Sequence, residues 1–457
     1  MIRAALAAAL LLLTAAPAAT QEPLRLGRDE GRALAAQLLA EGRPDAAAAI
    51  ARALLEADPQ DPGALAILAR AAFEAGEMAA ARQAAAAIWD SGAPVETRLG
   101  AARLAARAAA GEERFFVSEL WYRRALTLAG PDRVPAIEDE ARAMRRLSPW
   151  SVSLSFSIRP SANVNGGAET GDYVVNGETL GALTVAAQAL DGWIAETDLA
   201  LGYRLAQDAT SRTSLRFDLS DRHVRLSGRS RNALEEAGEE TIDVSTRSVE
   251  IGLDHVRLIG PSRVDLGLSL GRVAAGGEAI YDVAGFEARL SRPLGEADRL
   301  SFSLSQDWRE RTDGGTERLA EGGLAWTHAW PGGGVTRAGV ELSRLSTERA
   351  NTAFRRASLD VTHRLAQPLG PAELTLGGAV SVTEFDDYFV FDFPTFSFVD
   401  AGRRDRRALL TVEAALTGWS WAGFTPVATL EAERTFSNNS RFDSRNLGFG
   451  VEIRSTF

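Results

Sequence analysis

The sequence predicts an α + β protein of two domains, in which an N-terminal helical solenoid precedes an antiparallel transmembrane β-barrel of about 14 strands. Three observations predict this fold: a secretory leader, a repeat with helical spacing, and an alternation of apolar and polar residues that continues to the last residue. We expect a signal peptide over 1–20, a helical domain over 21–147 and the barrel over 148–457.

The first residues form a secretory signal. Arg3 is followed by an apolar run from Ala4 to Leu13 and by Ala16-Pro17-Ala18, which fits a cleavage site. This run is short for a membrane-spanning helix, and no later window holds about 18 consecutive apolar residues. The chain has no Cys, so neither lipoprotein acylation nor disulfides are expected. A helical membrane protein is therefore excluded, and a membrane β-barrel remains possible.

The net charge of the chain indicates which classes of partner it can bind. The net charge is −11, and all 50 basic residues are Arg. Such a balance speaks against a surface that binds polyanions, so nucleic acid is not an expected partner.

Helical spacing covers residues 28–129. The segments 31–59 and 63–89 align at an offset of 34 residues, with small residues where helices cross and Gly at the turns. This offset is typical of tetratricopeptide repeats, and a poorer third unit runs from about 95 to 128. Such repeats bind other proteins, but they also serve as spacers, and the sequence leaves both interpretations open.

The period changes to two at Ser148-Pro149-Trp150. In WSVSLSFSIR, residues 150–159, apolar side chains occupy one face and serines the other. The pattern returns at 214–222, 263–272 and 299–308, and again in the closing LGFGVEIRSTF. Short connectors alternate with longer ones, as they do in outer-membrane barrels.

The strand number follows from length. The 310 residues of 148–457 allow about 14 strands if each strand with its connector takes roughly 22 residues. Counting alternating segments gives fifteen, an odd number, because 177–206 reads either as one long strand or as a hairpin. Seven of the nine Trp lie in this half, mostly at strand ends, as an interfacial girdle requires.

A closed barrel must pair its last strand with its first. Trp150 and Phe156 on the first strand, with Phe449 and Phe457 on the last, are therefore candidate residues of the barrel seam and of the signal that the barrel-insertion machinery recognises. A short first strand would close the seam with few hydrogen bonds, and partial opening could admit a client's hydrophobic anchor. A permanently closed seam is the alternative.

A long connector, FDDYFVFDFPTFSF at 385–398, carries seven aromatic residues that are costly to expose to water. It could contact a client at the outer surface, or fold onto the lumen or rim. Its candidate residues are Tyr388, Phe389, Phe391 and Phe393.

No motif for catalysis is present. The four His, at 223, 255, 328 and 363, lie on four different expected strands without metal-ligand spacing, and the absence of Lys excludes an ATP-binding loop. Ser and Asp occupy inward positions that a wet lumen fills in any case. We expect no enzyme activity, no catalytic residue, no metal and no cofactor.

Two stretches, SPWSVSLSFSIRPSANVNGG and ERTFSNNSRFDSRNLGFGVEIRSTF, resemble the surface lipoprotein assembly modulator (Slam) family. The resemblance covers both domains in order and rests on Pro149-Trp150, on Asn163 and Asn165 after the first strand, and on Ser437-Asn438, Asp443 and Arg445 before the last. It implies periplasmic repeats before a barrel in the cell outer membrane, and translocation of lipoproteins or related secreted proteins to the cell surface.

The predicted function is therefore a translocator, with the client protein, the barrel-insertion machinery and outer-membrane lipid as partners. An exopolysaccharide export channel with periplasmic repeats is the main alternative, although it would favour a longer repeat array. A plain diffusion porin is third, because the helical domain argues against it.

Overall fold

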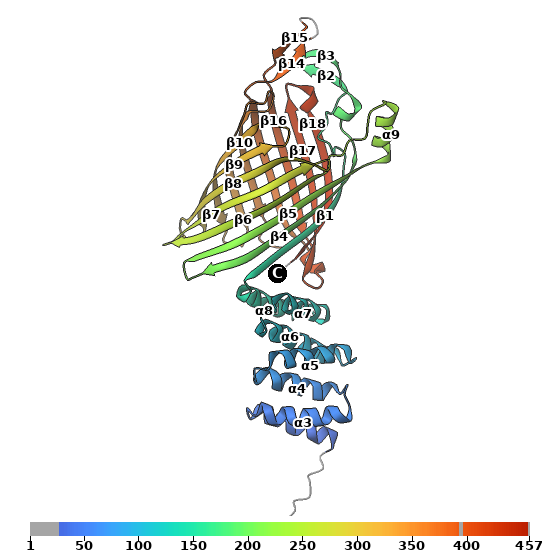
Figure 1. The fold of residues 1–457 in the computed structure, drawn as a ribbon, viewed down its shortest axis with the longest axis vertical. Coiled ribbons are helices and arrows are strands. Elements are labelled where there is room, and N and C mark those ends of the chain that lie inside the picture. Colours follow the sequence, from blue (N-terminus) through green and yellow to red (C-terminus); the bar gives the residue numbers. More distant parts are fainter. Residues whose placement is uncertain (1–26, 393–395, 456–457) are drawn as a thin grey trace, which may run out of the picture. The chain divides into compact units, whose positions relative to one another are not determined.

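The computed structural model describes residues 27–392 and 396–455. The expected signal peptide, Phe393 and Phe457 lie outside these ranges. The chain divides into two compact units, one ending at Gly130 and the other beginning at Pro131 (Figure 1).

The first unit is a stack of antiparallel helices. Most of its buried residues are Ala, which lets the helices approach closely. Turns between helices place Gly42 at φ 72° and Gly76 at φ 79°, a conformation that favours glycine and explains the repeated Gly at the 34-residue offset. The helices are α2 (Arg28–Ala40), α3 (Pro44–Ala57), α4 (Pro62–Glu74), α5 (Met78–Asp90), α6 (Val95–Gly111) and α7 (Phe115–Leu128).

One buried carboxylate ties the first helix of this unit to the third. Asp61 caps α4, where its Oδ1 accepts hydrogen bonds from the backbone N–H of Gly63 at 2.9 Å and Ala64 at 3.2 Å. Its Oδ2 accepts from Arg32 of α2 at 2.7 Å, and the Asp61 side chain is fully buried. Burial raises the pKa of Asp61, but the bonds from Arg32 and the two N–H groups outweigh it and leave the pKa lowered.

The second unit begins with α8 (Val134–Leu147) and continues as a closed antiparallel barrel of 14 strands, which confirms the expected number. The direct count of fifteen is wrong, since 177–206 contributes a single wall strand, β4, which begins at Gly192, whereas 178–182 belongs to a separate hairpin. The wall strands are β1 (Trp150–Ser161), β4 (Gly192–Gln207), β5 (Ser211–Leu226), β6 (Thr246–Ile259), β7 (Ser262–Ala275), β8 (Glu278–Pro293), β9 (Asp298–Arg311), β10 (Thr316–Ala329), β11 (Val335–Thr347), β12 (Phe354–Arg364), β13 (Glu373–Phe385), β16 (Arg404–Ala415), β17 (Phe424–Ser437) and β18 (Ser444–Ser455).

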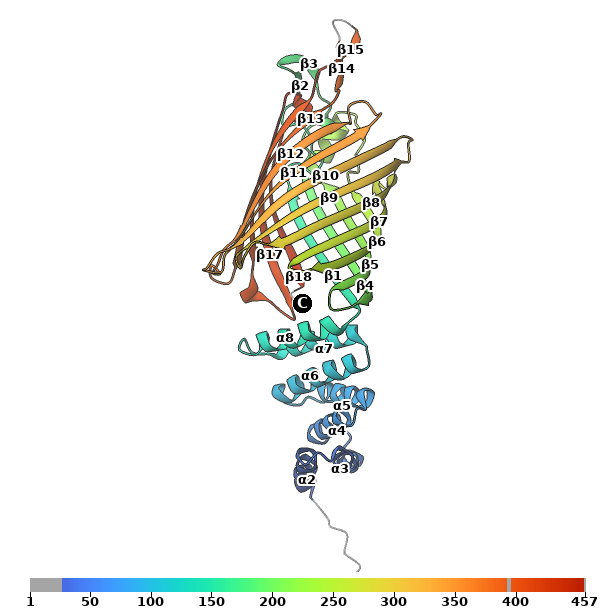
Figure 2. The ribbon, with the colours of Figure 1, turned by 90° about the vertical axis from the view of Figure 1, so that its left-hand side faces the viewer.

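The barrel has two different ends (Figure 2). We call the end where α8 joins β1 the near rim; its connectors are mostly short turns, such as those after Ile259 and Ala329. The opposite end is the far rim. It carries the hairpins β2 (Asp172–Val175) with β3 (Glu178–Ala182) and β14 (Phe389–Asp392) with β15 (Ser397–Asp400), as well as α9 (Gly228–Glu236) and the turn η3 (Ser440–Phe442).

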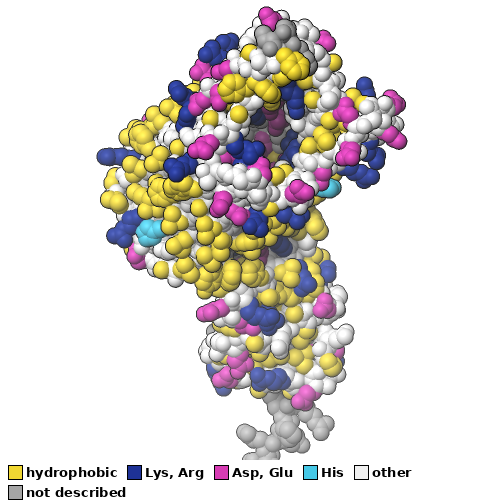
Figure 3. Space-filling model, turned by 45° about the horizontal axis from the view of Figure 1, so that its top comes forward, with side chains coloured by type: hydrophobic (Ala, Val, Ile, Leu, Met, Phe, Trp, Pro, Cys, Tyr) yellow, Lys and Arg dark blue, Asp and Glu magenta, His cyan; other side chains and the backbone are white. Residues whose placement is uncertain are grey.

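The outer wall is apolar. Cross-strand register places Leu154, Leu199 and Leu219 in one outward row, and Leu154 is 54% exposed. Figure 3 shows hydrophobic side chains gathered over this wall. Exposed Trp side chains mark both rims, Trp150 and Trp326 near and Trp193 and Trp308 far, as an interfacial girdle does.

None of the described helices is long and apolar enough to cross a membrane.

Candidate functional site at the barrel seam

The barrel closes where β1 meets β18, and this seam is sparsely paired. Between described residues, β1 and β18 share four partner pairs, whereas all twelve residues of β1 pair with β4. The four pairs are Phe156↔Ile453, Ser157↔Glu452, Ile158↔Val451 and Ser161↔Gly448, all in the half of β1 toward the far rim. β1 and β18 each have 12 residues, but they are staggered: Ser455, the last described residue of β18, lies opposite Leu154, so residues 150–153 have no described partner on β18.

Pro160 explains why the ladder is interrupted between Ile158 and Ser161. Arg204 N donates to Pro149 O at 2.7 Å, so odd-numbered residues of β1 direct their backbone groups toward β4 and even-numbered residues toward β18. Pro160 therefore faces β18 at a position that needs an N–H donor, and proline has none. The described ladder has no pair at Arg159 or Pro160.

Toward the near rim, α8 takes part in covering the β18 side of β1. By the same alternation, the carbonyl of Val152 faces β18, and it accepts a hydrogen bond from Arg145 Nη2 at 3.0 Å. A side chain from the helix thus satisfies a backbone group on the seam edge.

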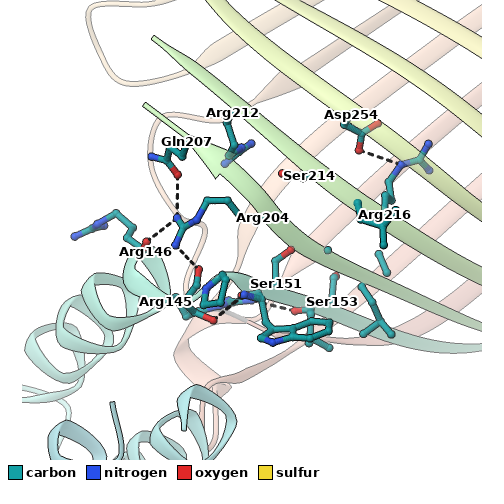
Figure 4. A pocket seen from close by; sticks show the side chains of 18 of the residues that line it. Arg145, Arg146, Ser151, Ser153, Arg204, Gln207, Arg212, Ser214, Arg216 and Asp254 are labelled. Atoms are coloured by element: carbon teal, nitrogen blue, oxygen red, sulfur yellow. Dashed lines mark hydrogen bonds and ion pairs between the residues drawn. The ribbon is translucent and has the colours of Figure 1, made fainter. Parts of the chain in front are cut away.

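The end of α8 is itself held by the barrel (Figure 4). The guanidinium of Arg204 on β4 donates from Nη1 to Arg146 O at 3.1 Å, and from Nη2 to Leu147 O at 2.8 Å and to Ser148 O at 2.9 Å. These carbonyls belong to the last turn of the helix and to its C-cap Ser148, where no intrahelical donor is available. Arg204 therefore acts as a C-terminal cap supplied by the barrel wall.

A basic pocket of about 670 Å³ opens at this place. Figure 4 shows its polar side chains converging from α8, β1, β4, β5 and β6. Asp254 is the one carboxylate among the described lining residues, and it pairs with Arg216 at 3.2 Å. The described lining thus holds five arginines and one carboxylate, although Arg216 also pairs with Asp218 and Glu250 outside the lining; the arginines are Arg145, Arg146, Arg204, Arg212 and Arg216.

An apolar notch of about 430 Å³ lies on the outer wall at the other end of the seam. Pro160, Trp193, Leu430, Leu447 and Phe449 contribute to its lining. The two recesses lie on different sides of β1: the described lining of the basic pocket extends from α8 and β1 to β6 without β18, whereas Leu447 and Phe449 of β18 line the notch.

Three of the four seam residues expected from the sequence lie on the outer face of the seam strands. Trp150, Phe156 and Phe449 are 44%, 47% and 53% exposed. Phe449 lines the notch and Trp150 the basic pocket. The fourth, Phe457, lies outside the described residues.

Asn163 and Asn165 organise the long connector that follows β1. Asn163 donates to Gly167 O and accepts from Gly167 N, both at 2.8 Å. Asn165 Nδ2 donates to Gln188 O at 2.8 Å, and its Oδ1 accepts from Leu190 N at 3.0 Å. The two amides therefore fold the connector back upon itself.

Asn438 joins three far-rim segments. Its Nδ2 donates to Asn176 Oδ1 at 2.8 Å and to Gly402 O at 2.6 Å, and its Oδ1 accepts from Arg404 N at 2.7 Å. The β2–β3 hairpin, the start of β16 and the end of β17 meet at this side chain.

Asp443 and Arg445 complete a latch between the first and last connectors. Glu169 N donates to Asp443 O at 2.8 Å, and the Glu169 carboxylate pairs with Arg434 and, at 3.6 Å, with Arg445. Arg434 also pairs with Asp443 at 2.9 Å. The hydrogen bond from Arg434 lowers the pKa of Glu169, whereas burial raises the pKa of Asp443. We call these four residues the far-rim latch.

The aromatic connector forms the β14–β15 hairpin. The Phe391 ring lies 5.4 Å from that of Phe398 and 5.2 Å from that of Phe396, yet Phe396 is 81% and Phe398 is 70% exposed. Phe389 pairs in register with Asp400. At the base, the Tyr388 ring packs on Phe442 at 5.7 Å, and burial raises the Tyr388 pKa. The hairpin is anchored below and presents aromatic side chains above.

The four His lie on four strands, β5, β6, β10 and β12. In the described part of the chain, no group of three His, Asp or Glu side chains could hold a metal ion. The geometry around the seam offers surfaces for binding.

Comparison with known proteins agrees with this division. A tetratricopeptide repeat family model matches residues 38–107, which run from α2 into α6. No curated protein matches the chain.

Solved structures similar to this chain include several outer-membrane proteins. OprB of Pseudomonas putida is 10% identical, with a TM-score of 0.36, over 70% of this chain and 96% of that one. OmpT of Vibrio cholerae is 9% identical, with a TM-score of 0.35, over 67% and 98%. A bacterial polysaccharide outer membrane secretin is 10% identical, with a TM-score of 0.32, over 66% and 98%. The closed even-numbered barrel with an apolar wall and aromatic rims defines an outer-membrane type of barrel.

Sequence reasoning missed Pro160, Arg145 and Arg204. A proline inside an alternating segment is a recognisable sign of an edge, and Pro160 could have been found from it. Arg204 carries no comparable signal, since arginine at an inward position is what a wet lumen contains anyway.

Replacing Arg204 with Ala should expose the end of α8 to protease. Loss of three charge-assisted hydrogen bonds should raise the rate of tryptic cleavage after Arg145 and Arg146 about tenfold. The matched control is Arg212→Ala, which changes the same pocket on β5 and should leave the rate close to that of the unaltered protein. Equal cleavage of the two variants would show that Arg204 does not hold the helix.

Proposed function

We propose that this protein is a non-enzymatic outer-membrane translocator that moves surface lipoproteins, or related secreted proteins, from the periplasm to the cell surface. One observation carries the proposal: β1 is sparsely paired with β18 among the described residues, and it borders a basic pocket on its β4 side and an apolar notch on its β18 side. A lipoprotein has a polar chain and a hydrophobic anchor, and these two recesses match the two parts. The resemblance to the Slam family supports the same function.

The orientation of the barrel in the membrane follows from the lengths of the connectors at its two rims. Outer-membrane barrels carry short turns on the periplasmic side and long loops outside, so the near rim with α8 faces the periplasm and the far rim faces outward. The basic pocket then receives the client's polar chain from the periplasm. The apolar notch lets its anchor reach lipid sideways.

The helical repeats recruit the client. Phe116 and Leu120 lie four residues apart on one face of α7 and are 55% and 51% exposed, which is the kind of surface that binds a protein partner. No nucleotide is used, and the energy comes from folding of the client or its capture outside. The exposed aromatic tip of the β14–β15 hairpin is positioned to contact the emerging client.

The C-terminal strand serves a second partner. Its outward row, which includes Phe449, is the signal read by the barrel-insertion machinery.

Deleting the gene tests the function against the polysaccharide-export alternative. We expect intact deletion cells to lose lipoproteins that added protease can reach in the parent strain, with exported polysaccharide unchanged. Loss of capsule or matrix sugar with normal surface proteins would instead establish polysaccharide export.

A further inference from the structure

A groove of about 570 Å³ crosses the outer wall from β9 to β13, away from the seam. It follows one cross-strand row in which large and small residues alternate. The Cβ that a side chain would add at Gly322 meets nothing within 4 Å, so the floor of the groove is open there. The row runs Leu304, Gly322, Leu342, Ala357, Val382.

Two arginines stand directly above this apolar row. Arg344 and Arg355 are cross-strand partners on the next row toward the far rim, and both line the groove. Like charges placed opposite each other repel. Asp386 pairs with Arg344 and lies 3.8 Å from Arg355 Nε, and Arg355 remains 74% exposed.

The local charge remains positive after these pairs are counted. Glu384, the register neighbour of Arg355, is engaged by Arg404 at 2.6 Å. Three arginines thus share two carboxylates at the upper end of the groove. The excess positive charge lies where the apolar wall gives way to the polar rim.

We propose that this groove binds one lipid molecule with an anionic, phosphate-bearing headgroup. Its acyl chain lies along Gly322 and Ala357, and its phosphate contacts Arg355 and Arg344. The arginine fork suits two phosphate oxygens at once. This inference rests on the membrane location in the proposed function, but not on translocation.

The position of the groove selects a lipid over a peptide. An extended peptide on the apolar wall would bring backbone N–H and C=O groups into hydrocarbon without partners, which costs several kcal/mol each. An acyl chain has no such groups. An acyl chain can lie over the small residues Gly322 and Ala357, between the larger side chains of the row.

Native mass spectrometry of the full-length protein in nonionic detergent tests the proposal. The probes are phosphatidylglycerol and phosphatidylcholine with identical acyl chains. We expect the protein to retain phosphatidylglycerol preferentially, and Arg344→Gln with Arg355→Gln to weaken that retention about tenfold. Ala357→Leu, which fills the groove, should weaken the retention of phosphatidylglycerol as well.

Two matched variants serve as controls. Arg247→Gln removes an outward arginine that pairs with Asp221 on β5, and Ala432→Leu enlarges an exposed alanine on β17 outside the groove. Both should retain lipid like the unaltered protein. Equal retention of the two lipids, or groove variants that behave like these controls, would overturn the proposal. The proposal would also be overturned if the arginine variant lost phosphatidylglycerol but Ala357→Leu retained it, because the apolar groove would then not take part in binding the lipid.

Discussion

Locking the seam with a disulfide is expected to abolish delivery of clients to the cell surface. Ser157→Cys with Glu452→Cys joins a directly opposed pair of β1 and β18. Ser157 is odd-numbered, so its backbone points to β4 and the pair is non-hydrogen-bonded, with Cα atoms about 4.5 Å apart, close enough for a disulfide. The chain has no Cys of its own, so the bond that forms is unambiguous.

Surface delivery is measured as client accessible to protease on intact cells, before and after a reductant. The matched control is Asp198→Cys with Ser220→Cys, an acid and a serine opposed on β4 and β5, where the ladder is continuous. This control should deliver normally, and the locked seam should recover when reduced. Normal delivery by the oxidised seam variant would show that clients cross through the lumen without lateral opening.

Replacing Asp61 with Ala should destabilise the helical unit by about 3 kcal/mol. The change removes the cap of α4 and leaves Arg32 of α2 without its buried partner. Thermal loss of the helical circular dichroism signal in the full chain measures the effect. Asp58→Ala is the control, because its pair with Arg28 is solvent-exposed and should contribute less than about 1 kcal/mol. Equal losses would refute the special role of Asp61.

The same carboxylate makes the helical unit sensitive to acid. The folded pKa of Asp61 is below the unfolded value of about 3.9, so its stabilisation is complete above that value and is lost as pH falls through the lower folded pKa. The difference in melting temperature between the unaltered protein and Asp61→Ala should therefore shrink at strongly acidic pH. A constant difference would indicate that the ionised form has no special stabilising role.

The elements of the fold were predictable because each has a local signal. Alternation from Trp150 onward defines the strands, and the repeated Gly at 42 and 76 marks helix turns that need positive φ. The small hairpin β2–β3 was not predicted, because its short strands resemble the start of β4. The far-rim latch was beyond prediction in detail, since Glu169 and Arg434 are 265 residues apart.

The functional recesses could not be predicted, because they arise from register. Gly322 and Ala357 are unremarkable small residues in the sequence, and only cross-strand neighbours on both sides turn them into the floor of a groove. The same holds for the notch, which needs Pro160 of β1 beside Phe449 of β18. Periodicity indicates which face a side chain occupies but not its neighbours.

The cap that Arg204 places on α8 decides where a mechanical load enters the barrel. A pull on the helix reaches β4 through three carbonyls, and β4 is joined to β1 along all twelve residues. β18 shares four described pairs with β1. A load carried by β4 and β1 together would therefore fall on fewer hydrogen bonds at the seam than between β1 and β4. A force on the helix would therefore act on the β4 side of the seam.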